Sequence, residues 1–342
     1  MKKYVMGFLI YCAVVLVVVP AAMVRFLSTD LAAKGTVIRV NNTQLQDNDE
    51  EKQNNTQLPQ DIVEEKKDTT EYAYEDVVPV QDEMENYIIG VVAAEMPALF
   101  EDEALKAQAV AARTYATNQM LKSGITIDKM IEDGGQAYIS QEEMHTKWNE
   151  GFDKYYNKIK TAVLSTKGEI MVYNNEPILA VFHAISRGKT EIAENVWNDS
   201  LPYLKSVDSS MDMESSEYTY ETTMPVKTVA SLLQKAHADL KLYDGSLKEQ
   251  MQVIDRTEAG YINTIQIGNK VFTGREVREI LGLRSSDFTV KQDGDNMVFT
   301  TNGYGHGAGM SQYGADSMAK DGKTYKEILT YYYTGIEFEK TE

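Results

Sequence analysis

Cysteine, histidine and basic residues are scarce in this chain, and each shortage excludes a class of protein. The 342 residues include a single cysteine, Cys12, which excludes a disulfide framework and a cysteine-ligated zinc site. Lys and Arg number 34 against 52 Asp and Glu, and the formal net charge is −18. A chain with this charge and no compact basic stripe repels phosphate backbones, so we expect no nucleic-acid partner.

The four histidines stand at positions 145, 183, 237 and 306. None of them has the HExxH or His-x-His spacing that brings two ring nitrogens to one metal ion. A metal site would need distant histidines to converge. We therefore expect neither a metal nor any other cofactor.

The longest apolar run lies near the N-terminus. From Tyr4 to Val24 the chain has 21 residues without a charge, close to the roughly 20 that cross a bilayer as a helix. Two lysines precede the run, so the positive-inside rule predicts a cytoplasmic N-terminus and an ectodomain on the extracytoplasmic side of the membrane. Small residues around Ala21 also fit a cleaved signal peptide, but the run is longer than the apolar core of one. We expect a single-pass anchor in the cell membrane over residues 1–25.

A polar segment follows the predicted membrane span. Residues 41–71 are rich in Asn, Gln, Asp and Glu and carry few large apolar side chains, so burial cannot offset the entropy of ordering them. We predict a disordered tether over residues 26–75 and a folded ectodomain over 76–342. About thirty flexible residues span roughly 30 Å, and the sequence leaves open whether this length provides reach or only spacing.

A carboxylate occupies an apolar position of the first ectodomain helix. Met84, Ile88 and Val91 are spaced by four and three residues, which is one face of an α-helix, and the next step reaches Glu95. Pro97 follows, so we expect the helix to end at Glu95. Burial raises the pKa of a carboxylic acid, which suits a general acid that protonates a glycosidic oxygen. A structural ion pair with a basic residue of the next helix is the alternative.

Two helices are expected to form a packed hairpin at the start of the ectodomain. Asp82 and Glu85 have the spacing of a capping box for the first helix. Residues 103–124 have helical periodicity, many alanines that permit close approach, and a final glycine that ends the helix. Within this second helix, Arg113 is the candidate partner for Glu95.

The rest of the ectodomain alternates short strands with helices. In chain order we expect two strands within 169–184, a helix over 226–240, a hairpin over 261–272, a helix after the capping box of Thr273 and Glu276, and a hairpin over 288–300. These elements predict an α+β fold with mostly antiparallel strands, a helical hairpin that lines a cleft, and an N-terminal transmembrane helix. A smaller α+β sub-domain is expected as an insertion at about 208–300.

Residues 302–315, NGYGHGAGMSQYGA, form a loop with five glycines. Such density permits positive φ angles or close backbone approach. No Gly-Lys-Ser/Thr ending or Rossmann spacing follows, so a phosphate cradle is not expected. Two interpretations remain, a structural turn and a loop that presents His306, Ser311, Gln312 and Tyr313 to a bulky ligand.

Several segments together resemble the stage II sporulation protein D family, in the same order along the chain. They are GVVAAEMP (90–97), EALKAQAVAARTYA (103–116), FHAISRGKTEIAENVW (182–197), YLKSV (203–207), GREVREILGLRSSDF (274–288) and NGYGHGAGMSQYGA (302–315). The resemblance covers nearly the whole ectodomain. It implies a peptidoglycan lytic transglycosylase that cuts between N-acetylmuramic acid and N-acetylglucosamine and leaves a 1,6-anhydro end, during engulfment in sporulation.

The resemblance also implies which residues form the site. Its catalytic glutamate falls on Glu95, the residue that the helix-face argument reaches separately. The residues implied to bind substrate are Arg113, His183, Ser186, Lys189, Thr190, Tyr203, Lys205, His306, Gln312 and Tyr313. Arg113 and Lys205 are expected to contact the lactyl carboxylate of peptide-stripped muramic acid, since a fixed cation favours an anion.

Two departures from the family pattern stand out. Gly135 replaces a cysteine that many members have before the Gln-Ala-Tyr segment, so the zinc site of some relatives is expected to be absent. Arg187 occupies a position that is usually glycine in a Ser-Gly-Gly-x-Thr-Glu loop, and it is expected to alter the loop's shape or polarity.

The resemblance implies two partners besides glycan strands, the sporulation amidase called protein P and the membrane anchor called protein M. An alternative function from another class is a non-catalytic scaffold that grips glycan and recruits a cell-wall amidase. A metal-dependent amidase is disfavoured by the few available metal ligands. Glu95 discriminates between the first two, because a scaffold has no need of an unpaired acid on an apolar helix face.

Overall fold

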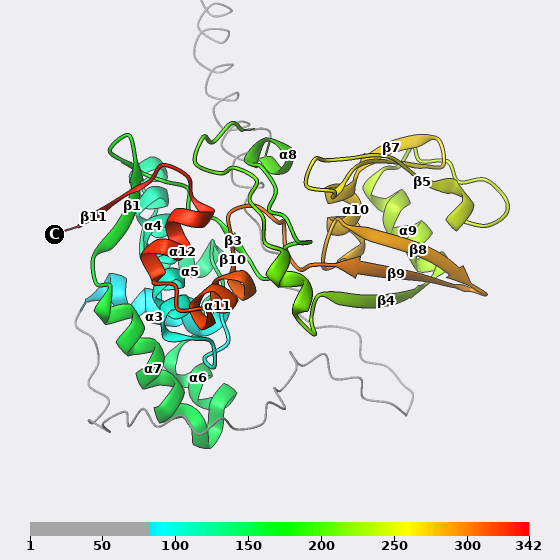
Figure 1. The fold of residues 1–342 in the computed structure, drawn as a ribbon. Coiled ribbons are helices and arrows are strands. Elements are labelled where there is room, and N and C mark those ends of the chain that lie inside the picture. The colour runs from blue at the N-terminus through cyan, green and yellow to red at the C-terminus, as the bar shows by residue number, and fades with distance from the viewer. Residues whose placement is uncertain (1–81, 134, 198, 342) are drawn as a thin grey trace, which may run out of the picture. The chain divides into compact units, whose positions relative to one another are not determined.

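The computed structural model describes residues 82–341 with the exception of 134 and 198 (Figure 1). The predicted membrane anchor and tether lie outside these residues, and the predicted domain boundaries stay predictions. No helix among the described residues is both long and apolar enough to cross a membrane.

Helices and small antiparallel sheets share the described part of the chain, which confirms the predicted α+β class. The strand orders there are β11-β1-β2, β10-β3, β4-β9-β8 and β5-β6-β7. The pair of β10 with β3 is parallel, whereas the pairs in the larger sheets are antiparallel.

One helix forms the centre of the helical part. α4 (Asp102–Ser123) contacts α3, α7, α11, α12 and β1, and Figure 1 shows α11 and α12 beside it. The other helices of this part are α3 (Glu83–Glu95), α5 (Ile127–Asp133), α6 (Gln141–Trp148), α7 (Phe152–Ser165), α11 (Gln312–Lys320) and α12 (Tyr325–Tyr332), of which α5 contacts α3 and α6 contacts α7. Most alanines of α4 are buried, and their small side chains let these neighbours approach its backbone closely.

Both ends of the predicted helical hairpin are confirmed. The Asp82 side chain accepts a hydrogen bond from the Glu85 backbone N–H at 3.3 Å and caps α3. The helix ends at Glu95 because Met96, which precedes a proline, is extended. α4 ends at Gly124, whose φ of 62° favours glycine. The Glu85 side chain does not complete a capping box, because it turns into the core.

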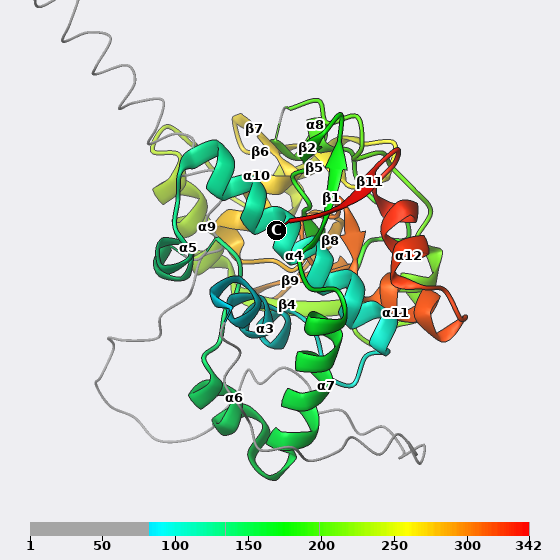
Figure 2. The same cartoon turned by 90° about the vertical axis from the view of Figure 1, so that its left-hand side faces the viewer.

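The strand pair predicted within 169–184 is shorter than expected. β1 (Glu169–Tyr173) pairs with β2 (Glu176–Pro177) on one side and with β11 (Glu337–Lys340) on the other, as Figure 2 shows. Pro177 has no N–H to donate to the strand ladder. Two residues further along the chain, the Leu179 N–H donates to the Tyr203 hydroxyl at 3.0 Å instead of to a neighbouring strand. The chain therefore leaves β1, and β3 (Phe182–His183) pairs instead with β10 (Met310–Ser311).

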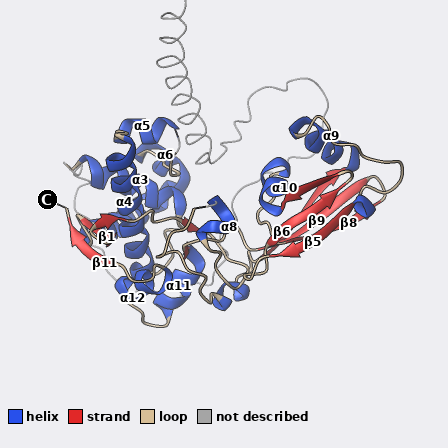
Figure 3. Ribbon diagram, turned by 90° about the horizontal axis from the view of Figure 1, so that it is seen from above, coloured by secondary structure: helices blue, strands red, loops and turns tan. Residues whose placement is uncertain are grey.

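A second hydrophobic core lies within residues 219–302. Its elements are β4 (Thr219–Pro225), α9 (Val226–Ala236), β5 (Met251–Arg256), β6 (Ile262–Ile267), β7 (Lys270–Thr273), α10 (Gly274–Leu281), β8 (Phe288–Asp293) and β9 (Asn296–Asn302). Figure 3 shows α9 and α10 on one side of these strands, and Val229, Phe272, Val277 and Phe299 pack between the layers. We refer to residues 219–302 as the sub-domain.

Both hairpins and the Thr273–Glu276 capping box of this region are confirmed. Two of its strands, β4 and β5, were not predicted. The helix predicted over 226–240 ends earlier, at Ala236, because His237 is extended and packs edge-on against Phe272 with ring centroids 4.8 Å apart.

Arg187 stands where the family pattern usually has glycine, in the loop after β3. Its side chain attaches this loop to the sub-domain. Its Nε donates to Asp287 at 2.9 Å and its Nη1 donates to the Ala259 carbonyl at 3.0 Å. Arg256 holds the other oxygen of Asp287 at 2.6 Å. The guanidinium therefore bonds within the protein, and its main effect is on the position of the loop.

Candidate functional site

Glu95 stands at the C-terminal end of α3, where it is only partly accessible to solvent. Its Oε1 accepts a hydrogen bond from the Ala137 backbone N–H at 2.9 Å, and its carboxyl group also bonds to the Gln312 side chain. Burial raises the pKa of Glu95, and the two hydrogen bonds oppose part of that rise. Among the described residues no cation pairs with Glu95, so burial dominates its ionisation.

Gln312 is held in turn by a second buried amide. Its Nε2 donates to the Gln108 Oε1 at 3.3 Å, and both side chains are buried. Ser311 caps α11 by accepting the Gly314 N–H at 3.1 Å, which fixes Gln312 as the first residue of that helix. An amide NH₂ has two hydrogens, so one Gln312 nitrogen joins Glu95 on α3 to Gln108 on α4.

The segment that supplies the Ala137 N–H lies against α3. Gln136 accepts a hydrogen bond from the Tyr87 hydroxyl at 3.3 Å, and Tyr138 stacks on Tyr87 with ring centroids 5.8 Å apart. A Cβ on Gly90 would overlap the Tyr138 ring. Glycine at position 90 thus lets this segment approach α3 and aim its N–H at Glu95.

Arg113 lies in the interior and not in a cleft, which corrects the prediction that it contacts substrate. Its side chain is 1% exposed, and its guanidinium forms two hydrogen bonds with Glu85, at 2.9 and 2.6 Å. The same group donates to the carbonyls of Glu169 at 3.0 Å and Val163 at 3.3 Å. With its donors directed to these partners, Arg113 joins α3, α4, α7 and β1, and it is not the partner of Glu95.

The glycine-rich loop and residues 182–191 run together. β10 pairs with β3, and bridges join Ile185 to Tyr304 and Glu191 to Ala308. A Cβ on Gly309, where φ is 73°, would overlap the Val181 carbonyl. The glycines therefore serve close backbone approach, which favours the structural interpretation of this loop.

His183 and His306 meet in these two segments, with ring centroids 5.7 Å apart. The His183 Nδ1–H donates to the Ala308 carbonyl at 3.0 Å, and its buried Nε2 has no hydrogen-bond partner among the described residues. Burial lowers the pKa of His183 to about 4, and burial together with His183 and Arg278 lowers that of His306. Both imidazoles are therefore neutral at neutral pH.

Ser186 and Thr190 are buried and bond within the protein. The Ser186 N–H donates to Asp212 at 2.8 Å, and the Thr190 Oγ1 accepts the Val207 N–H at 2.9 Å. Asp212 also accepts from the hydroxyls of Ser209 and Ser311, and burial raises its pKa. These contacts hold the loops around β3 and β10 together.

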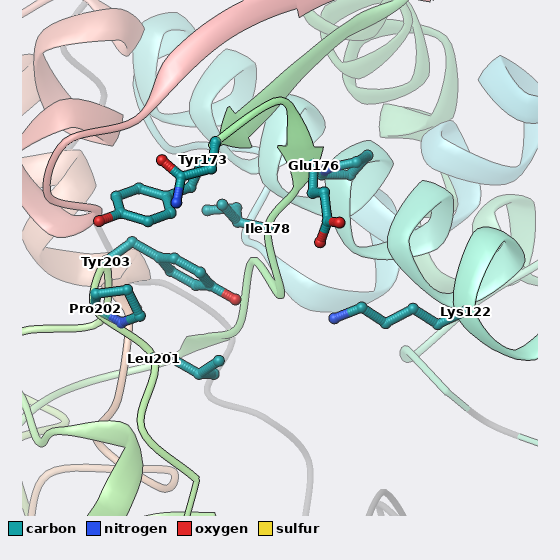
Figure 4. Close-up of a pocket in the computed structure, with 9 residues that line it drawn as sticks. Lys122, Tyr173, Glu176, Ile178, Leu201, Pro202 and Tyr203 are labelled. Carbon is teal, nitrogen blue, oxygen red and sulfur yellow. The ribbon is translucent and has the colours of Figure 1, made fainter.

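The remaining predicted substrate residues lie at different places. Lys205 is exposed and Lys189 is partly exposed, and Tyr313 packs edge-on against Phe100 with ring centroids 4.9 Å apart. Tyr203 lines a separate hollow with Lys122 (Figure 4). Of the predicted set, Gln312 is the one that the described contacts bring to Glu95.

Comparison with known proteins identifies the family. The family model for the stage II sporulation protein matches residues 75–173. The stage II sporulation protein D of Bacillus subtilis is 43% identical over 264 residues, which is 76% of this chain and 75% of the relative. The chain belongs to the stage II sporulation protein D family.

Two further relatives extend this result. The stage II sporulation protein D of Bacillus amyloliquefaciens is 39% identical over 76% of this chain and 75% of its own length. A Bacillus subtilis protein named amidase enhancer is 30% identical over 72% of this chain, but over only 39% of its own length. The region matched by the family model includes Glu95 and Arg113 as well as Gln108 and Ala137.

Sequence reasoning missed two groups of the Glu95 site. Gln108 is a polar residue at a buried position of the alanine-rich helix α4. The helical periodicity of the sequence could have identified it as a polar residue on the buried face. The Ala137 N–H is a backbone group in an irregular segment, and no residue type marks such a donor. Among the described residues no three His, Cys, Asp or Glu side chains gather in a way that would hold a metal ion.

Proposed function

We propose that this member of the stage II sporulation protein D family is a membrane-anchored lytic transglycosylase that cuts peptide-stripped peptidoglycan during engulfment. The observation that carries the proposal is the state of Glu95, a carboxyl group with a raised pKa and no paired cation among the described residues. Family membership supports a role in sporulation. A raised carboxyl pKa is what a general acid near neutral pH requires.

The proposed reaction moves one proton out of Glu95 and another back. Protonated Glu95 donates to the glycosidic oxygen as the bond between C1 of muramic acid and that oxygen breaks. The resulting carboxylate accepts the proton of the 6-hydroxyl as the 6-oxygen bonds to C1 and closes the 1,6-anhydro ring. No water is consumed, and one carboxyl group serves both steps, unlike the usual pair in glycosidases.

The surroundings of Glu95 suit both of these states. Burial favours the protonated acid before the first transfer. The N–H groups of Ala137 and Gln312 stabilise the carboxylate that exists between the two transfers. The helical hairpin of α3 and α4 is proposed to line the cleft that receives the glycan. The single-pass anchor and the cooperation with proteins P and M belong to the same proposal.

Glu95→Gln tests the assignment, because glutamine keeps the size of the side chain but has no acidic proton. We expect loss of cleavage of peptide-free glycan by at least about 10²–10⁴-fold, with glycan binding retained. Glu142→Gln on exposed α6 removes a carboxylate elsewhere and should cleave normally. Full cleavage by the Glu95 variant contradicts the proposal.

A non-catalytic scaffold that recruits an amidase is the second candidate, and the relative named amidase enhancer favours it. Under this alternative, purified protein leaves peptide-free glycan intact and stimulates a cell-wall amidase. That stimulation would survive Glu95→Gln. The two candidates therefore differ in two measurements. The enzyme cleaves peptide-free glycan and loses this activity with Glu95→Gln, whereas the scaffold stimulates an amidase with or without the substitution.

A further inference from the structure

A hollow of about 370 Å³ lies beside the end of α4, apart from Glu95. It is bounded by the C-terminal turn of α4, the turn between β1 and β2, and residues 201–203. The Asn118 side chain donates to the Pro177 carbonyl at 2.6 Å and holds this turn against the helix. This hydrogen bond fixes one wall of the hollow, the turn between β1 and β2, relative to α4.

Tyrosine and proline side chains make the walls of the hollow. Tyr173 and Tyr203 lie with ring centroids 5.7 Å apart and their planes at 53°. The Tyr203 oxygen accepts the Leu179 N–H at 3.0 Å, which fixes the hydroxyl in place, and its own proton has no acceptor among the described residues. Pro177 and Pro202 add apolar surface. Such a wall provides flat apolar faces together with one oriented donor.

Two opposite charges face the same space without pairing with each other. Figure 4 shows the Lys122 ammonium, the Glu176 carboxylate and the Tyr203 hydroxyl pointing toward one another across the hollow. Lys122 and Glu176 are exposed, and neither belongs to an ion pair in the described part of the chain. Each of these groups is therefore available to a ligand.

This combination of groups selects one class of ligand. A nucleic acid, which carries a charge on every nucleotide, is disfavoured by Glu176 and by the net charge of −18. A purely apolar ligand would gain nothing from the ammonium, the carboxylate or the tyrosine hydroxyl. A sugar has an apolar face for the tyrosines and hydroxyl or amide hydrogens for Glu176, and a single carboxylate on it would complement Lys122.

We propose that this hollow, which we call the Lys122 hollow, binds a sugar unit that carries a free carboxylate. The proposal rests on the proposed function, for which peptide-stripped glycan is the substrate, because removal of the peptide uncovers the lactyl carboxylate of muramic acid. Lys122 lies fourteen residues beyond Gln108 in α4, which is about 21 Å along the helix axis. The hollow is therefore separate from the Glu95 site, and its lining residues do not include Glu95, Gln108 or Gln312.

The test measures binding in the Glu95→Gln background of the full-length protein, where cleavage does not consume the ligand. The probes are peptide-free peptidoglycan oligosaccharides and chito-oligosaccharides of matched length, which have no carboxylate. We expect tighter binding of the acidic glycan, and we expect Lys122→Gln to weaken it about two- to fivefold while binding of the neutral glycan stays the same. Lys122→Arg should keep the preference.

Lys227→Gln is the matched control, because it removes an equal charge from exposed α9 of the sub-domain. A Lys122→Gln variant that binds both glycans as before, or a control that loses the same affinity, overturns the proposal. Its failure is distinct from failure of the proposed function, which is measured separately as cleavage by the wild-type protein. Lys122 is exposed, so these variants should fold normally.

Discussion

At the scale of single residues, the proposed chemistry depends on Glu95 and its two hydrogen bonds. The helix-face spacing was sufficient to select Glu95 from the sequence, because an acid at an apolar position of an amphipathic helix is visible in the pattern. Its partners were less visible. Gln312 lies in the glycine-rich segment, but its contact with Gln108 joins residues far apart in the chain, and only the folded structure brings them together.

Glu95→Gln should stabilise the folded protein at neutral pH. The folded-state pKa of Glu95 is raised, so ionisation of this buried group costs stability once the pH exceeds its ordinary range. We expect a gain in the free energy of unfolding at pH 7, which fades as the pH falls and wild-type Glu95 becomes protonated. Urea unfolding at pH 7 and pH 4 measures this, and a variant less stable than the wild type at pH 7 contradicts it.

Gln108→Met should shift the pH dependence of cleavage. The substitution removes the acceptor that orients the Gln312 amide, which weakens a hydrogen bond that lowers the pKa of Glu95. A higher pKa keeps the general acid protonated to higher pH, so the alkaline limb of the activity profile should move upward. Gln119→Met, on the same helix and away from Gln312, is the control. If the Gln108→Met protein folds normally and the alkaline limb of its activity profile does not move, Gln108 does not position Gln312 for Glu95.

At the scale of helices and strands, the sequence predicted the ends of α3 and α4 accurately. α3 and α4 ended at Glu95 and before Gly124 because Pro97 and a glycine act through local backbone geometry. The length of β2 was overestimated, because the Leu179 N–H, which a longer strand would use in its ladder, donates to the Tyr203 hydroxyl. Tyr203 is distant from β2 in the sequence. Tertiary contacts of this kind have no local signal.

Glu85 illustrates the same limit. Its spacing from Asp82 matches a capping box, yet its carboxylate bonds to Arg113 in the interior. The helical spacing of the segment from Glu83 to Glu95 does not reveal this, since a first-turn glutamate is ordinarily solvated. The family resemblance implied that Arg113 binds substrate, whereas its bonds to Glu85 give it a structural role.

Arg113→Ala should destabilise the protein by about 3–5 kcal/mol, because it leaves the buried Glu85 carboxylate without its partner. A double variant, Glu85→Gln with Arg113→Met, removes both charges and should recover a large part of that loss. Chemical denaturation of the three proteins measures the effect. If Arg113→Ala keeps the wild-type stability and loses only glycan affinity, the residue contacts substrate after all.

At the scale of the whole molecule, the loops around β3 and β10 connect the helical part with the sub-domain. Asp212 ties three serine-containing segments together, and Arg187 and Arg256 share Asp287. The family resemblance implied that Ser186 and Thr190 bind substrate, but it did not reveal that both are buried. Residue type alone does not distinguish a polar group that faces substrate from one that holds a loop.

Acid should destabilise the molecule through His183. Its folded pKa of about 4 lies below the ordinary 6.5, so stability is complete above about pH 6.5 and is lost as the pH falls toward 4. The loss from this residue is about 3 kcal/mol. His183→Asn should flatten the pH dependence over this range in thermal unfolding. An equally steep profile in the variant assigns the acid sensitivity to other groups.

The identity of the product tests the central claim most directly. Peptide-free glycan is digested in water enriched in ¹⁸O, and the new ends are examined by mass spectrometry. The account predicts 1,6-anhydro ends that are lighter than hydrolysed ends by one water, carry no ¹⁸O and are missing with Glu95→Gln. Ends that carry ¹⁸O, or anhydro ends formed at the wild-type rate by the Glu95→Gln protein, would contradict it.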